Sequence, residues 1–117
     1  MKISKNFTRE DFACTCGCGF KAVDIQLLEW AEIICAKYGK IKIHCACRCL
    51  KHNRTIKDSK DTSQHIRGLA LDFHIIGMKN NDTLVLEYLN LLVGDKGGVG
   101  CYNWGYHIDC RGKRARW

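Results

Sequence analysis

A histidine and an aspartate stand seven residues apart in the segment SQHIRGLALD, with a glycine between them. Asp72 lies in a run, residues 69–76, in which apolar residues alternate with small or polar ones. This period-2 alternation is typical of a half-buried strand and turns Asp72 away from the core. Because glycine adopts backbone angles that other residues avoid, Gly68 allows His65 to fold back over Asp72. Both side chains are metal ligands, and a third ligand has to come from elsewhere in the chain.

A second candidate strand near the end of the chain supplies another histidine. In YHIDCR, residues 106–111, His107, Asp109 and Arg111 share one face. His65, Asp72 and His107 together offer nitrogen and oxygen ligands and leave one tetrahedral position open, as in catalytic zinc sites. On spacing alone, a surface histidine and a hydrogen-bonded strand histidine are the simpler interpretation.

The elements that must position these residues follow from periodicity and end signals. They indicate a small α+β domain, with a mainly antiparallel sheet and helices packed on one side of it. With no proline and no repetitive stretch, residues 1–117 are interpreted as a single domain. The expected elements are a helix at 24–39, a strand at 40–48, a loop at 50–64, a strand at 68–76, a helix at 81–94 capped by Asn81 or Asp82, and a hairpin of strands 99–103 and 106–111.

The expected strand at 40–48 has two faces of different character. Lys40, Lys42, His44, Ala46 and Arg48 fall on one face by strict alternation. Ile41, Ile43, Cys45 and Cys47 fall on the other. Arg48 is therefore placed on the face opposite Cys45.

Composition restricts the partners without choosing one. The 117 residues carry a formal charge of +7, which favours anionic partners such as nucleic acid, anionic lipid or an acidic cell-wall polymer. The N-terminal MKISKNFTRE is followed by no apolar run, and no stretch approaches the roughly 18 apolar residues of a membrane span. We therefore expect no signal peptide, no membrane span, and synthesis in the cytoplasm.

The nine cysteines do not form a familiar pattern. Their odd number prevents complete pairing within one chain, and a reducing cytosol argues against a disulfide framework. The Cys-x-Cys-x-Cys runs lack the Cys-x-x-Cys spacing typical of zinc ribbons. We expect packing or structural roles for most of these cysteines rather than a second metal site.

The motif beginning at Ser63 extends to a resemblance over nearly the whole chain. SQHIRGLALD has every fixed residue of Ser-x-His-x-x-Gly-x-Ala-x-Asp, and the chain resembles the zinc D-alanyl-D-alanine peptidases, relatives of lysostaphin-type enzymes with the hedgehog-type fold. CACRCLKHN is similar to their Ser-Gly-Tyr-Arg-Cys-Pro-x-His-Asn stretch. GVGCYNWGYHIDCRG and REDFACTCGCGF resemble segments of the branch that contains small phage lysins.

The resemblance implies a role for each matching residue. His65, Asp72 and His107 would bind Zn²⁺, and Arg48 would steady the substrate and the developing oxyanion. Many related zinc peptidases carry a carboxylate base three residues before the last histidine, where this chain has Trp104. Asp109 would then act either as that base or as a carboxylate that orients a ligand histidine.

These residues favour a zinc peptidase that hydrolyses an amide bond in peptidoglycan stem or cross-link peptides, as an endolysin-like enzyme or a D,D-carboxypeptidase or endopeptidase. Such an enzyme would be a monomer that acts on the cell wall after phage-type release. The alternative is an inactive, zinc-containing cell-wall binding module of the same fold. A cysteine-rich nucleic-acid binder explains the charge but not the ordered motifs, so we expect no nucleic-acid partner.

Overall fold

The computed structural model describes residues 1–56, 60 and 63–117. A five-stranded sheet runs in the order β1-β2-β4-β3-β5, and all its pairings are antiparallel except that of β3 with β5. The strands are β1 Ile41–Cys45, β2 Ala70–Ile75, β3 Gly98–Tyr102, β4 Gly105–Asp109 and β5 Ala115–Arg116. The α+β class and the mainly antiparallel sheet are thus confirmed.

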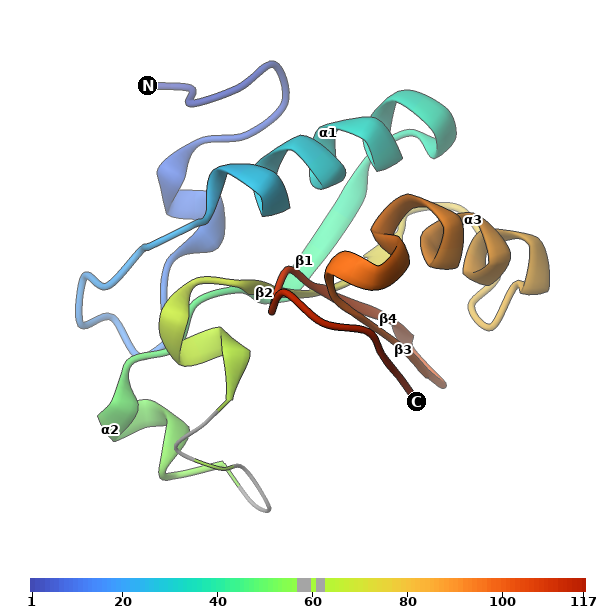
Figure 1. Ribbon diagram of the computed structural model, residues 1–117. Coiled ribbons are helices and arrows are strands. Elements are labelled where there is room, and N and C mark those ends of the chain that lie inside the picture. Colours follow the sequence, from blue (N-terminus) through green and yellow to red (C-terminus); the bar gives the residue numbers. More distant parts are fainter. Residues whose placement is uncertain (57–59, 61–62) are drawn as a thin grey trace.

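Two helices, α1 (Ile25–Tyr38) and α3 (Thr83–Val93), pack on one face of this sheet (Figure 1). Both begin at aspartate N-caps: Asp24 accepts a hydrogen bond from the backbone of Gln26, and Asp82 accepts from the first turn of α3. Their buried apolar side chains form one core with the inward face of the sheet. The apolar positions of the alternating segments in β2 and β4 point into this core, as expected. The core includes Leu27, Trp30 and Ile34 of α1, Val85, Leu89 and Val93 of α3, and Leu71, Phe73, Val99, Tyr106 and Ile108 of the sheet.

Two short elements lie between β1 and β2 in the chain. They are the one-turn helix α2 (Leu50–Asn53) and the 3₁₀ turn η2 (Gln64–Arg67), which leads into β2 and contacts it. In Figure 1 both lie away from α1 and α3. The remaining short elements are the 3₁₀ turns η1 (Arg9–Phe12) and η3 (Gly94–Lys96). No described helix has the length and apolar character needed to cross a membrane.

Three expectations need correction. The region 50–64 is not simply a loop, because it contains α2 and the start of η2; residues 57–59 and 61–62 of that prediction lie outside the described residues. The strand expected over 40–48 stops at Cys45. The fifth strand, Ala115–Arg116, was missed because two residues in a basic tail carry no periodic signal.

The most consequential difference is a bulge in β1. The pairing with β2 shifts between Ile43 and Cys45, so that Ile43 lies opposite Phe73 while Cys45 lies opposite Asp72. Because directly paired residues share a face, Cys45 turns to the Asp72 side of the sheet. Ala46 is buried in the core instead. Strict alternation had placed both residues on the wrong faces.

Candidate metal and active site

The sheet register brings two of the predicted ligands side by side. Asp72 in β2 pairs directly with His107 in β4. Their side chains share the face away from the helices, and Nδ1 of His107 lies 2.7 Å from Oδ1 of Asp72. The alternation seen in both segments therefore predicted this juxtaposition correctly.

His65 reaches the same carboxylate from η2. Ser63 caps this turn through its hydroxyl, and Gly68 ends it with a φ of 69°, a left-handed conformation that glycine adopts without strain. A side chain at this glycine would also meet the backbone of Ala22, at 2.9 Å. Nε2 of His65 lies 3.1 Å from Oδ2 of Asp72, so each oxygen of Asp72 faces one histidine.

The hydrogen bond at the second ring nitrogen of His65 determines which nitrogen faces the site. Nδ1 lies 2.5 Å from the carbonyl oxygen of Ala46. Because a carbonyl only accepts hydrogen bonds, Nδ1 carries a proton and Nε2 is the nitrogen presented to the site. Burial opposes the charged ring, but hydrogen bonding to Asp72 outweighs it and raises the pKa of His65 to about 10.

His107 is held in a similar way between two carboxylates. Its Nδ1 faces Asp72, and its Nε2 lies 2.7 Å from Oδ2 of Asp109. Both rings are nearly buried, with side-chain exposures of 6%. Each imidazole thus has an acceptor at both nitrogens, so the nitrogen that faces Asp72 either carries a proton or shares a cation with the carboxylate. A divalent metal ion is such a cation, so this donor set fits a zinc site.

Both carboxylate oxygens of Asp109 are occupied by hydrogen-bond partners. It is fully buried, and Oδ1 accepts hydrogen bonds from the backbone of Gly98 and from the backbone and Nε of Arg111. Oδ2 accepts from Nη2 of Arg111 at 2.6 Å and faces His107. Burial favours protonation, but the hydrogen bonds from His107 and Arg111 prevail and hold the pKa of Asp109 below its usual range. This geometry favours an orienting carboxylate over a base.

An open cleft of about 440 Å³ lies over these ligands. Arg48 lines it and is tied to the site by its backbone N–H, which donates to the carbonyl oxygen of His65 at 2.9 Å. Nη2 of Arg48 is 3.4 Å from the hydroxyl of Ser63. The cleft is lined by Arg48, Lys60, Ser63, Gln64, His65, Asp72, Tyr102, His107, Arg111 and Trp117.

The C-terminal tryptophan forms one wall of this cleft. The ring of Trp117 lies 4.7 Å from that of His107, and its indole N–H donates to the hydroxyl of Tyr102 at 3.0 Å. A Cβ at Gly100 would come within 2.5 Å of the Trp117 ring, so only glycine leaves room for it. A larger cleft of about 600 Å³ lies between the N-terminal segment and β1, but it contains none of the predicted ligands.

A model of the peptidase M15 family matches residues 5–109, almost the whole chain. The chain belongs to the peptidase M15 family. No curated protein and no solved structure matches it significantly. Membership confirms the resemblance to metallopeptidases at the level of the family, and the α+β fold described above is consistent with it.

The sequence did not indicate one further residue of the candidate metal site. Cys45 lies beside His65, with Sγ 3.6 Å from Nδ1. Cys45, His65 and Asp72 offer three possible ligand atoms within 4.8 Å of one another. His107 contacts the other carboxylate oxygen of Asp72, Oδ1. The bulge in β1 carries Cys45 to this face, and no feature of the local sequence indicated the bulge.

Proposed function

We propose that this M15 peptidase is a zinc-dependent hydrolase of peptidoglycan peptides. The observation that carries the proposal is Asp72, whose two oxygens face His65 and His107 at the floor of an open cleft. Zinc held there by His65, Asp72 and His107 would polarise a scissile carbonyl and activate water.

Arg48 is proposed as the residue that holds the developing oxyanion. Its guanidinium lines the same cleft, and its Nε makes no hydrogen bond to any described residue. A cation held in place beside the reacting atoms stabilises the negative charge that develops in the transition state. Tethering of Arg48 to His65 through the backbone keeps the guanidinium near the ligands.

The remaining lining residues suit a peptide that carries carboxylates. Arg48, Lys60 and Arg111 give the cleft three cations, and Tyr102 and Trp117 give it flat apolar surfaces. Peptidoglycan stem and cross-link peptides combine free carboxylates with small side chains. The net charge of +7 would assist attraction to an acidic cell wall. We propose that the protein acts there as a monomer, in the manner of a small phage lysin, with no nucleic-acid partner.

A second candidate function is a cell-wall binding module that has lost catalysis. It is favoured by the cleft lining, in which Asp72 is the single carboxylate among the described residues. Asp109 is buried behind His107 and does not line the cleft. Without an accessible base, a zinc site could bind stem peptides without cutting them.

The test is digestion of purified peptidoglycan by the zinc-loaded protein, with mass spectrometry of the released muropeptides. We expect fragments that differ from the intact muropeptides by the hydrolysis of one amide bond. These fragments should be absent with His107→Ala and present with His74→Ala. His74 is a matched control because it lies on the same strand face as Asp72 but contacts His44 instead. Co-sedimentation with the cell wall without any release of fragments would support the binding module and overturn the peptidase.

A further inference from the structure

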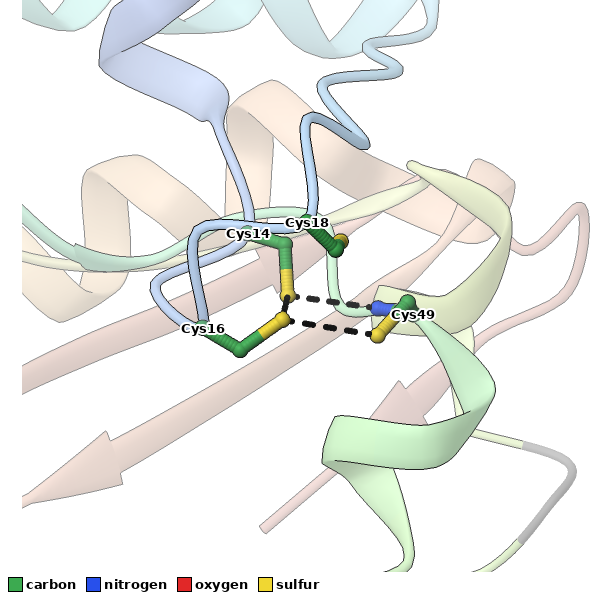
Figure 2. A group of neighbouring side chains, drawn as sticks. All are labelled: Cys14, Cys16, Cys18 and Cys49. Atoms are coloured by element: carbon green, nitrogen blue, oxygen red, sulfur yellow. Dashed lines mark hydrogen bonds between the residues drawn. The ribbon is translucent and has the colours of Figure 1, made fainter.

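Four cysteines from two distant segments converge beside α2. Cys14, Cys16 and Cys18 lie on the loop after η1, and Cys49 is the N-cap residue of α2. Their four Sγ atoms all lie within 4.8 Å of one another. Figure 2 shows Cys49 beside the loop that carries the other three, with the sulfurs of Cys14, Cys16 and Cys49 directed toward one another.

The spacing of the sulfurs matches that around a tetrahedral metal ion. Sγ of Cys16 lies 3.4 Å from that of Cys14 and 3.7 Å from that of Cys49. Zinc–sulfur bonds of about 2.3 Å in a tetrahedron place neighbouring sulfurs about 3.8 Å apart. A disulfide requires an S–S distance of about 2.05 Å, much shorter than these contacts. Sulfurs this close together also leave little space for an iron–sulfur cluster, in which each thiolate binds a different iron atom.

Backbone N–H groups point at the sulfurs as they do around metal-bound thiolates. The N–H of Cys49 donates to Sγ of Cys14, that of His52 to Sγ of Cys49, and that of Phe20 to Sγ of Cys18, each at 3.4 Å. Such donors offset the negative charge of a thiolate and orient it. Three of the four cysteines therefore already have a partner suited to the ionised form.

The loop backbone is shaped to present alternate residues to one point. Gly17 and Gly19 have φ angles of 81° and 89°, in the left-handed region that other residues avoid. A Cβ at either glycine would meet no atom within 4 Å, so the requirement is on backbone angle alone. Gly17 turns the chain between Cys16 and Cys18, and Gly19 turns it directly after Cys18, which explains how Cys-x-Cys spacing replaces the usual Cys-x-x-Cys.

We propose that Cys14, Cys16, Cys18 and Cys49 bind one zinc ion in a closed structural site, separate from the candidate active site. Four thiolates complete a tetrahedron and leave no position for substrate or water, which is the structural type of zinc site. This interpretation replaces the packing role that the cysteine spacing suggested.

The structural role follows from what the site would connect. The chain between η1 and α1 has no helix or strand, so it lacks the regular backbone hydrogen bonds of those elements. Cys49 directly follows Arg48, whose backbone binds His65. A metal at this cluster would therefore fix the N-terminal loop against the segment that carries Arg48, which lines the candidate active-site cleft.

The experiment counts metal in the protein purified under reducing conditions and then replaces it with Co²⁺. A Cys₄ site gives intense thiolate-to-cobalt absorption, whereas a site of histidines and a carboxylate does not. In the background of Asp72→Ala with His107→Ala, which removes the proposed active-site metal, we expect one zinc per chain and a full thiolate–cobalt band. Adding Cys49→Ser should abolish both, and adding Cys101→Ser, a half-buried cysteine outside the cluster, should preserve both.

A measurement on the unmutated chain covers the case in which Cys49→Ser fails to fold. Titration with a thiol-specific mercurial should release one zinc per chain as the cluster thiols react. A coloured zinc indicator measures the release. Metal content and cobalt spectrum unaffected by Cys49→Ser, or no zinc released by the mercurial, would overturn the proposal. Iron with acid-labile sulfide, or a disulfide between cluster cysteines, would overturn it as well. All these readouts are independent of peptidase activity.

Discussion

Oδ2 of Asp109 lies 2.7 Å from Nε2 of His107, at the ring nitrogen that does not face Asp72. Arg111 and the backbone of Gly98 hold Asp109 in place. A carboxylate behind a ligand histidine fixes its ring and increases its basicity. The two roles that the sequence left open for Asp109 therefore make different predictions, and the geometry favours the orienting one.

We predict that Asp109→Asn weakens zinc binding about 10- to 100-fold and that excess zinc restores most of the turnover, as expected for an orienting group. Zinc affinity and turnover at saturating zinc are measured together. Asp95→Asn is the control, because Asp95 is an exposed carboxylate in surface contact with Arg114, away from the candidate site. Turnover that stays about 100- to 10,000-fold low in saturating zinc would instead identify Asp109 as the general base.

Gly98→Ala tests the same carboxylate from its other side. A Cβ at Gly98 would lie 2.6 Å from Oδ2 of Asp109, within a pocket that cannot expand without moving β4. Overpacking of this kind costs about 1–3 kcal/mol in the free energy of unfolding. We expect a lower midpoint of denaturant unfolding together with weaker zinc binding. An unchanged zinc affinity would show that the position of Asp109 does not matter to the metal.

How far the sequence predicts this protein differs between elements. The Asp24 cap, Gly39 and the apolar spacing between them predict α1 because these signals are local. Alternation in β2 and β4 likewise predicts that Asp72 and His107 share a face. The bulge at Cys45 depends on how β1 pairs with β2, and the cysteine cluster depends on the path of a loop. Neither leaves a periodic trace in the sequence.

Arg48→Lys is predicted to lower kcat by about 100- to 1,000-fold with a smaller change in KM, the loss expected when an oxyanion donor is removed. Lysine keeps the charge but lacks the planar fork that binds two oxygens. Arg67→Lys is the control, because Arg67 is an exposed arginine of the neighbouring turn η2. A rise in KM alone would assign Arg48 to substrate binding rather than to the transition state.

The pH dependence of stability is expected to include a contribution from Glu32. Its carboxylate accepts hydrogen bonds from the backbone N–H and the side-chain amide of Asn6, which ties the N-terminal segment to α1. Burial favours protonation, but the nearby Ser4 hydroxyl and the hydrogen bonds from Asn6 outweigh it and lower the pKa of Glu32.

Because the folded-state pKa is lowered, this contribution is complete above the unfolded-state pKa of about 4.3 and is lost as the pH falls through the folded value. We predict that Glu32→Gln costs about 1 kcal/mol of unfolding free energy at pH 7 and that the difference from the unmutated protein shrinks below about pH 5. Urea unfolding across this range measures it, with the exposed Glu29→Gln of the same helix as control. A difference that stays constant down to pH 3 would mean that the charge of Glu32 does not hold the N-terminal segment.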